Sequence, residues 1–263
     1  METDGISIID TTADNVLQCG LCGYKKPDKP GFAEKLNWLN KHTDKGLRIK
    51  SLLTENDGTQ GMIEYIPGEH CFRPVSARGY MFVHCIFSGF KNIYKHKGYG
   101  SLLIDECVKD ARREKLNGVA VVTRKGSFMA TKDIFVKNGF EVVANAPSDF
   151  ELLALKFKKN TANPEFIDNS KQLETKYLKG LYILRADQCP YTVKNVAEIA
   201  ETAKSEFGID ANVITLNSFK EAQCSPCAFG TFCMIYNGVI CAEHPISKTR
   251  FINIMRKLCT KRH

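Results

Sequence analysis

One loop constrains the fold of this chain more than any other feature: Lys95-His96-Lys97-Gly98-Tyr99-Gly100-Ser101. It follows a nearly continuous apolar strand predicted over 80–87 and precedes a helix predicted over 101–116, whose apolar residues return every three or four positions. The two glycines let the backbone approach a ligand closely, and the first-turn amides of a helix have no partner within it. Such a loop can bind a pyrophosphate, with the lysines adding positive charge.

The glycine pattern alone is a weak signal, because a plain turn between strand and helix has the same composition. The loop is not a P-loop NTPase site, since the pattern G-x-x-x-x-G-K-[ST] is missing, and it is not a full G-x-G-x-x-G nucleotide fingerprint. The predicted strands and helices around the loop are therefore needed to assign its function.

The first part of the chain places this loop within a mixed array of strands and helices. Strands predicted over 47–53 and 60–66 flank Asn56-Asp57-Gly58, where the glycine can supply the positive φ of a tight hairpin turn. The remaining predicted elements are a helix around 32–40, a short buried strand over 119–123, a helix over 129–137 that ends at Asn138-Gly139, and strand character over 141–157.

The second part has the order β-α-β followed by β-β-α, which predicts a small α/β domain. Its predicted elements are strands over 181–184 and 212–216, a helix around 193–200, a hairpin over 231–241 across Asn237-Gly238, and a last helix with apolar residues at 251, 254, 255 and 258. The polar stretch 158–164 ends in proline and separates the two parts. We expect a first domain over 1–158, a linker over 159–176 and a second domain over 177–263.

The composition is that of an ordinary globular protein, with 43% hydrophobic residues and a formal net charge of +8 in 263 residues. Both parts share the positive excess, so no basic segment indicates nucleic-acid binding. No apolar run of 18 residues and no basic-then-apolar leader is visible, which predicts a cytoplasmic protein with no membrane partner. The oligomeric state is left open.

Three features together resemble the GNAT acyltransferase superfamily: the pattern [QR]-x-x-G-x-[GA] after a long strand, an amphipathic helix directly behind it, and a Gly-Phe pair about forty residues later. Here the loop 95–100 and Asn138-Gly139-Phe140 match that pattern, with Lys95 at the first position. Cys22-Gly23-Tyr24, the segment 63–68 and Arg73-Pro74-Val75 are more similar to the YoaP-like branch, in which a GNAT domain precedes a thioredoxin-like domain. The resemblance covers essentially the whole chain.

This resemblance implies an α/β fold: a GNAT-type mixed central sheet, flanked by helices and splayed open between its fourth and fifth strands, followed by a small thioredoxin-like α/β domain. It implies an N-acetyltransferase that uses acetyl-CoA as cosubstrate, needs no metal, and acetylates an amine of an unidentified small molecule or peptide. The cofactor-binding residues that it implies are Cys85, Ile86, Phe87, Lys95, His96, Lys97, Gly98, Tyr99, Gly100, Ser101 and Phe135.

The catalytic groups are less clear from the sequence. Phe135 stands where the family has a tyrosine general acid, and a phenyl ring cannot donate a proton, so another group or water must protonate the leaving thiolate. Glu64, on the strand over 60–66, is the first candidate base, although a solvent-facing strand carboxylate is the alternative. His84 is the second candidate, and strict alternation along its strand predicts that it faces away from Cys85.

Eleven cysteines in a chain without an export signal cannot form a fully paired set of disulfides. Cys189-Pro190-Tyr191-Thr192 looks like a glutaredoxin active site without its second cysteine, and a helix start stabilises a thiolate, so Cys189 is a possible redox thiol. The C-x-x-C pairs at 19–22 and 224–227 leave a shared zinc site or thiol exchange with Cys189 open. The cysteines expected in the core are Cys85, Cys107, Cys233, Cys241 and Cys259.

Two function classes remain. The first is an N-acetyltransferase, and the alternative is a thiol-disulfide protein of the glutaredoxin type whose N-terminal domain binds CoA. A metal or thiol sensor is a third, non-enzymatic interpretation. The residues 22–46, which include Trp38, are expected to form a wall of the acceptor site in the first case.

Overall fold

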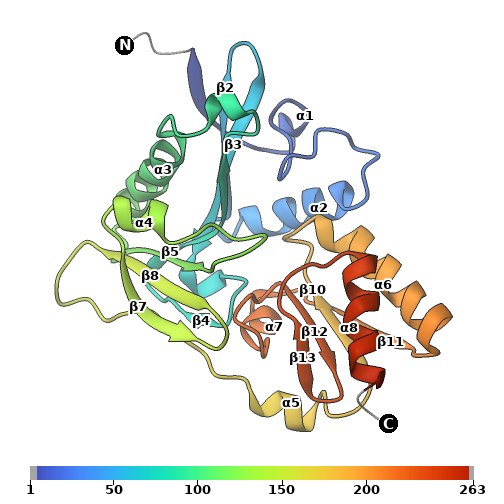
Figure 1. Cartoon of the computed structure of the whole chain (residues 1–263). Coiled ribbons are helices and arrows are strands. Elements are labelled where there is room, and N and C mark those ends of the chain that lie inside the picture. Colours follow the sequence, from blue (N-terminus) through green and yellow to red (C-terminus); the bar gives the residue numbers. More distant parts are fainter. Residues whose placement is uncertain (1–4, 261–263) are drawn as a thin grey trace. The chain divides into compact units, whose positions relative to one another are not determined.

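The computed structural model describes residues 5–260, which form two compact units, each built around one main sheet (Figure 1). The first unit comprises Met1–Cys71 and Val75–Phe166, and the second comprises Phe72–Pro74 and Ile167–His263. The predicted linker over 159–176 carries two short elements, β9 (Glu165–Phe166) and α5 (Lys171–Thr175).

The first unit contains most of the strands. Its strands are β1 (Ile6–Asp10), β2 (Arg48–Thr54), β3 (Gly58–Pro67), β4 (Val75–Ser76), β5 (Tyr80–Ser88), β6 (Gly118–Thr123), β7 (Glu141–Ala146) and β8 (Phe150–Lys156). Its helices are α1 (Val16–Cys19), α2 (Phe32–Thr43), α3 (Tyr99–Arg113) and α4 (Asp133–Lys137), with short 3₁₀ turns η1 (Gly68–His70) and η2 (Asn92–Tyr94). The short strand β4 pairs with β9 outside the main sheet.

The main sheet of this unit is mixed and has the strand order β1-β2-β3-β5-β6-β8-β7. All neighbours are antiparallel except β5 and β6, which run parallel. A parallel pair needs a crossover connection, and α3 supplies it between these two strands. The parallel pair is therefore the place where the loop before α3 meets the sheet.

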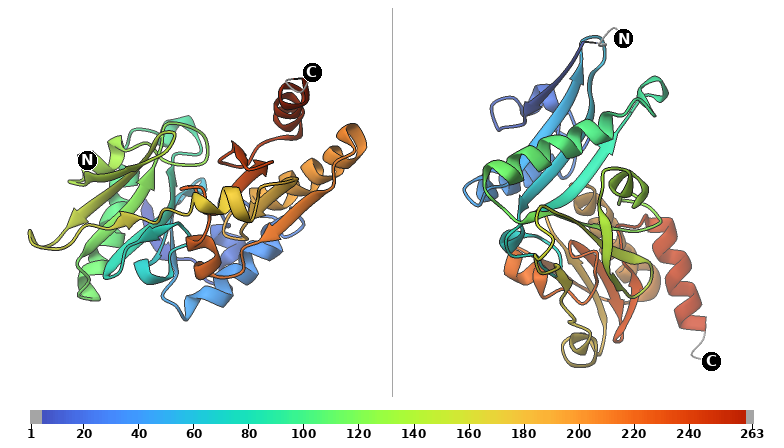
Figure 2. Two further views of the ribbon diagram at one scale, coloured as in Figure 1. Left: turned by 90° about the horizontal axis from the view of Figure 1, so that it is seen from below. Right: turned by 90° about the vertical axis from the view of Figure 1, so that its left-hand side faces the viewer.

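Helix α3 packs along the sheet because its apolar residues share one face (Figure 2). Leu103, Ile104, Cys107 and Ala111 are at most 1% exposed, as their spacing predicted. Full burial of one such leucine or isoleucine contributes about 1.5–3 kcal/mol. The core between α3, α4 and the sheet consists of Leu52, Ile63, Tyr65, Met81, Val83, Tyr94, Tyr99, Leu103, Ile104, Cys107, Ala111, Val119, Val121, Phe135, Phe140 and Leu153.

The second unit has one four-stranded sheet in the order β11-β10-β12-β13. Its elements after α5 are β10 (Leu181–Arg185), α6 (Tyr191–Phe207), β11 (Ala211–Thr215), α7 (Phe219–Gln223), β12 (Phe232–Tyr236), β13 (Val239–Ala242) and α8 (Lys248–Thr260). Strands β10 and β11 are parallel, whereas β12 is antiparallel to both β10 and β13. The predicted hairpin across Asn237-Gly238 is confirmed as β12 and β13.

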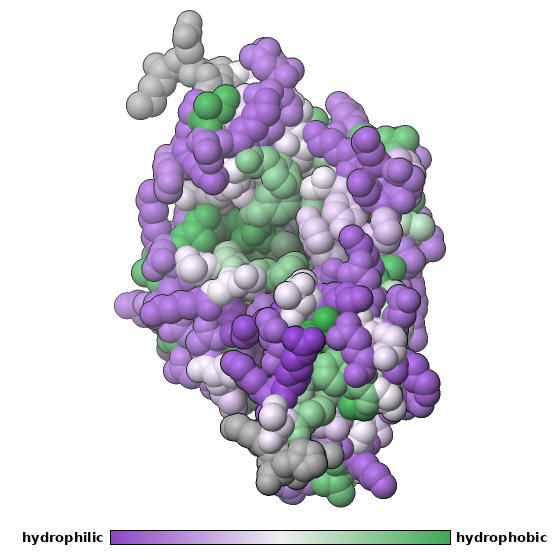
Figure 3. Space-filling model, turned by 45° about the vertical axis from the view of Figure 1, so that its right-hand side comes forward, coloured by the Kyte–Doolittle hydropathy of each residue, from purple (hydrophilic) through white to green (hydrophobic). Residues whose placement is uncertain are grey.

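The mixed α/β architecture with helices against a large sheet is confirmed, while several short elements differ from the prediction. The helix predicted over 129–137 is helical only in α4, and β1, α1, α5 and α7 were not predicted. Within residues 5–260, no helix combines the length and apolar character needed to cross a bilayer. The surface in view in Figure 3 is mainly hydrophilic, with apolar residues in smaller areas.

Candidate active site

The main sheet of the first unit opens between β5 and β6. These strands pair only over Tyr80–Val83 and Gly118–Val121, whereas β5 stays paired with β3 as far as Ser88. Within residues 5–260, the edge of β5 over Cys85–Phe87 therefore lies beyond the pairing with β6. An extended ligand can pair with such an edge as if it were a further strand. Since β5 and β6 are fourth and fifth in the sheet, the opening lies where the resemblance placed it.

The predicted phosphate loop leads from β5 into the first turn of α3. Gly98 is the N-cap of α3 with a φ of 82°, and a Cβ on it would meet no heavy atom within 4 Å. The amides of Ser101 and Leu102 donate to the carbonyl of Gly98, whereas those of Tyr99 and Gly100 precede any intrahelical acceptor. A left-handed glycine with open space beside it, at the start of a helix, suits the pyrophosphate of acetyl-CoA.

The other predicted cofactor residues lie around this loop with different exposures. Lys97 places its ammonium 5.8 Å from the ring centre of Tyr94, and Lys95 and His96 are exposed. Tyr99 is 5% exposed and belongs to the core beneath α3. Phe135 is fully buried and packs edge-on against Phe140, with ring centres 5.3 Å apart. Contact of these residues with acetyl-CoA stays a prediction.

A buried ionic cluster lies on the sheet beside α2. The ammonium of Lys35 on α2 donates to Oε2 of Glu64 on β3, and Nδ1 of His84 on β5 lies 3.2 Å from Oε1 of the same carboxylate. The side chains of all three residues are 0% exposed. The Lys35 ammonium also lies 4.1 Å from the ring centre of Trp38. Three segments far apart in the sequence thus share one buried charge network.

The electrostatics of this cluster keep Lys35 and Glu64 charged. Burial raises the pKa of the Glu64 carboxyl, but the Lys35 ammonium and the His84 ring outweigh burial and lower that pKa to about 2. Burial lowers the pKa of Lys35, but the Glu64 carboxylate outweighs it and raises that pKa. The alternative of a solvent-facing strand carboxylate is therefore wrong for Glu64.

His84 reaches Glu64 because β5 contains a bulge. Glu64 is opposite Cys85 and Tyr65 is opposite Val83, so His84 is the additional residue of β5 between two regular pairs. The expectation that alternation turns His84 away from the face of Cys85 is wrong, because the bulge breaks the alternation. Cys85 is opposite Glu64 and so lies on the same face as that carboxylate.

Two members of this region are not predicted by the sequence pattern. Lys35 is expected only as part of a helical wall, because a lysine on an amphipathic helix is usually solvated. Cys22 lies in a two-residue turn with a φ of 49°, next to Gly23 at 87°, and burial raises the pKa of its thiol. The segment Cys22-Gly23-Tyr24 was noted for its pattern, but its place beside Lys35 and Glu64 could not be read from that pattern.

Cys189 lies in the second unit just before α6, whose N-cap is Pro190. Thr192 is fully buried, and its hydroxyl donates to the carbonyls of Cys189 at 2.8 Å and Ala186 at 3.3 Å. Thr192 therefore stabilises the turn that positions Cys189. The helix start predicted after Cys189 is confirmed, and its redox role stays a prediction.

The other cysteines differ in burial from what was expected. Cys107 and Cys233 are buried as predicted, while Cys85, Cys241 and Cys259 are only half-buried. Of the two C-x-x-C pairs, Cys19 and Cys227 are buried, Cys22 is half-buried and Cys224 is exposed; Cys71 is also buried. Over residues 5–260 the structure contains no group of three or more His, Cys, Asp or Glu side chains arranged to hold a metal ion.

Comparison with known proteins gives relatives for both parts of the chain. A family model described as YoaP-like matches residues 211–253. The chain is 27% identical over 251 residues to the uncharacterized N-acetyltransferase YoaP of Bacillus subtilis (strain 168), covering 95% of this chain and 96% of that protein. Both findings support the resemblance to the YoaP-like branch.

The two solved structures described next each match more than half of the chain. One is a putative acetyltransferase of the GNAT family from Desulfovibrio desulfuricans, with a TM-score of 0.42, 20% identity, and coverage of 58% of this chain and 99% of that chain. Another is yncA, a putative acetyltransferase from Salmonella typhimurium with its cofactor acetyl-CoA, with a TM-score of 0.42, 14% identity, and coverage of 60% of this chain and 97% of that chain.

Proposed function

We propose that this chain is an acetyl-CoA-dependent N-acetyltransferase that acetylates an amine of a small molecule or peptide. The observation that carries the proposal is the opening between β5 and β6, where the edge of Cys85–Phe87 lies beyond the β5–β6 pairing and the chain continues to the N-terminus of α3 at Gly98. The relative in B. subtilis that matches almost the whole chain is named an N-acetyltransferase, which agrees with this assignment.

The residues at the opening fit acetyl-CoA as a cosubstrate that supplies an activated acetyl thioester. In this proposal the backbone edge of Cys85–Phe87 binds the pantetheine amides, and the amides of Lys97 to Ser101 hold the pyrophosphate. The side chains of Lys95, His96 and Lys97 add charge and donors there. In this proposal the buried ring of Phe135 packs behind the cofactor site and stabilises its wall.

For the proton of the acceptor ammonium we propose His84 as the base and Glu64 as its positioning residue. Because the His84 side chain is 0% exposed, this proposal requires that the bound acceptor displaces neighbouring side chains to reach it. A carboxyl with a pKa of about 2 is a weak base, so Glu64 serves better to hold the imidazole through Nδ1. Lys35 in turn keeps Glu64 ionised. This arrangement replaces the first assignment of Glu64 as the base itself.

The second unit is proposed to be a thioredoxin-like domain and the first a GNAT-type domain, with domains over 1–158 and 177–263 and a linker over 159–176. The element order β-α-β-α-β-β-α and the strand order β11-β10-β12-β13, with a single parallel pair, support the thioredoxin-like assignment. Cys189, just before α6, stays the predicted redox thiol of that domain. The cytoplasm stays the predicted compartment.

A screen of amines, amino acids and peptides with acetyl-CoA tests the function, with acetylated product identified by mass spectrometry, because the protein's own cysteines disturb a free-thiol assay. We expect one class of amine to be acetylated by the wild-type chain and by Cys189→Ser alike. Thiol-disulfide exchange that is lost in Cys189→Ser, together with no acetylation of any amine, would establish the redox alternative instead.

A further inference from the structure

A cavity of about 560 Å³ lies in the first unit and contains none of the residues of the phosphate loop in its wall. Its wall comes from the segment between β1 and α1, the second half of α2, the start of β2 and the last turns of α3. The phosphate loop is at the other end of α3, and a helix of 15 residues spans about 22 Å. This cavity is therefore separate from the proposed cofactor site, and its volume is typical of a small-molecule site.

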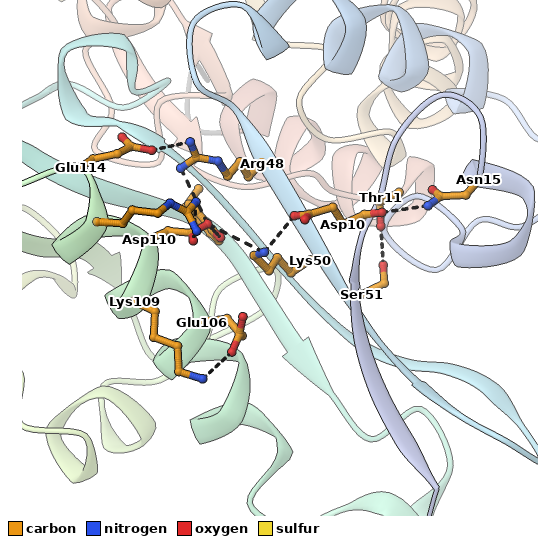
Figure 4. A network of polar contacts seen from close by, with 12 residues as sticks. Asp10, Thr11, Asn15, Arg48, Lys50, Ser51, Glu106, Lys109, Asp110 and Glu114 are labelled. Carbon is orange, nitrogen blue, oxygen red and sulfur yellow. Dashed lines mark hydrogen bonds and ion pairs between the residues drawn. The ribbon is translucent and has the colours of Figure 1, made fainter.

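One part of the wall gathers three cations around a single buried carboxylate (Figure 4). Asp110 is 2% exposed and accepts from the hydroxyl of Tyr65 at 2.7 Å and from Nη2 of Arg113 at 2.8 Å. Nη1 of Arg48 and Nζ of Lys50 lie 3.7 and 3.8 Å from the same carboxylate, which is beyond good hydrogen-bond distance. Asp110 therefore does not accept a well-formed hydrogen bond from Nη1 of Arg48 or from Nζ of Lys50.

Arg48 and Lys50 each have one further acidic partner, and these partners do not occupy all of their N–H groups. Nη2 of Arg48 pairs with Glu114, while its Nη1 is buried and makes no hydrogen bond within the described part of the chain. Lys50, with a side chain only 11% exposed, has its ammonium 3.0 Å from Asp10, whose side chain is 62% exposed. A buried guanidinium nitrogen whose nearest acceptor is 3.7 Å away is unfavourable, and a ligand oxygen would satisfy it if the guanidinium turned towards the cavity.

The anionic groups of the wall make a simple anion an unsuitable ligand. Asp10 ends β1, and the exposed Asp14 lies between β1 and α1. With Asp110 they balance the three cations of the wall. Thr11, Thr12 and Thr43 also line the cavity, and the hydroxyl of Thr43 donates to the carbonyl of Leu39. A wall with both signs of charge on different segments matches a ligand that carries both signs.

We propose that this cavity binds a small zwitterion of the α-amino-acid class, separately from acetyl-CoA. The ligand's carboxylate accepts hydrogen bonds from Arg48 and Lys50, and its ammonium lies beside Asp10 and Asp14. The site goes beyond the proposed acetyl transfer, because none of its residues belongs to the opening between β5 and β6.

Calorimetric titration of the full chain with each of the standard L-amino acids tests this proposal. We expect at least one amino acid to bind, and its N-acetyl and methyl ester derivatives to bind at least tenfold more weakly, because each derivative lacks one charge. Lys50→Gln and Asp14→Asn should each weaken binding about tenfold; Asp14 is exposed, so its variant tests the site without disturbing the core. Gly98→Ala should leave this binding unchanged.

Lys109→Gln is the matched control, because Lys109 pairs with Glu106 on the same helix but does not line the cavity. Its affinity for the amino acid should equal that of the wild-type chain. The proposal is overturned if no amino acid binds at millimolar concentration, if the singly charged derivatives bind equally well, or if Lys50→Gln and Asp14→Asn both bind as tightly as Lys109→Gln.

Discussion

The phosphate loop and the buried Lys35–Glu64–His84 cluster lie in the same unit but are built in different ways. The loop is a continuous segment whose proposed ligand-binding groups are backbone amides at a helix start. The cluster consists of three charged or titratable side chains from α2, β3 and β5, and it depends on a bulge in β5. The first is open to a ligand, whereas the second is closed to solvent.

The difference shows that the two halves of the proposed site can be changed independently. Backbone amides keep their positions when a distant side chain is replaced, while the cluster loses its charge balance when any member is removed. We therefore expect substitutions in the cluster to affect turnover and stability, and substitutions in the loop to affect the affinity for acetyl-CoA.

The largest effect is expected for His84→Asn. Loss of the proposed base should lower kcat by roughly 10²–10⁴-fold, since that is the usual contribution of general base catalysis. The dissociation constant for acetyl-CoA should change less than about threefold, because the cofactor is held elsewhere. Steady-state kinetics and calorimetry on one preparation measure both, and a variant with unchanged kcat would exclude His84 as the base.

Lys35→Met should lower the free energy of unfolding by about 3–5 kcal/mol, because it leaves the Glu64 carboxylate buried without its ammonium partner. Urea unfolding followed by circular dichroism measures this. Adding Glu64→Gln to the variant should restore part of the loss. Lys109→Met serves as control, since the exposed Lys109–Glu106 pair is expected to contribute below about 1 kcal/mol. If Lys35→Met and Lys109→Met lowered the free energy of unfolding equally, the buried Lys35–Glu64 pair would not have the stabilising role proposed for it.

Stability should fall in two steps as the pH is lowered. The pKa of His42 is lowered from 6.5 to about 4, mainly by burial, so the unfolded chain takes up that proton first and stability falls between pH 6.5 and 4. The pKa of Glu64 is lowered from 4.5 to about 2, so its contribution of about 3 kcal/mol is present above pH 4.5 and lost towards pH 2.

Unfolding curves at a series of pH values separate these two groups. His42→Gln should flatten the step between pH 6.5 and 4, and Glu64→Gln the step below pH 4.5. If Glu64→Gln left the acid limb of the wild-type curve unchanged, Glu64 would not carry the lowered pKa.

The smallest effect is expected for Gly98→Ala, compared with Gly208→Ala at the end of α6. Both glycines are left-handed, with φ of 82° and 65°, and a Cβ on either meets no heavy atom within 4 Å. Both variants should therefore lose a similar stability of about 1–2 kcal/mol. Only Gly98→Ala should weaken acetyl-CoA binding, by about tenfold, in a calorimetric titration. Equal affinities in the two variants would argue against the loop as the phosphate site.

The sequence predicted those features that depend on local pattern. The loop before α3, the hairpin of β2 and β3 and the helix start after Cys189 all follow from spacing or turn residues within a few positions. The β5 bulge could not be predicted, because one additional residue in a continuous apolar strand leaves no mark in its composition. The pairing of Lys35 with Glu64 is likewise a tertiary contact that appears only once α2 packs on the sheet.

Hydrogen–deuterium exchange of the full chain with and without acetyl-CoA tests whether the cofactor binds at the opening between β5 and β6. We expect acetyl-CoA to slow exchange of the amides in two segments, Cys85–Phe87 at the edge of β5 and 97–101 at the start of α3. Exchange in the second unit and around the cavity at Arg48 should stay unchanged. Protection confined to other segments, or none at saturating acetyl-CoA, would contradict the assignment of the opening between β5 and β6 as the cofactor site.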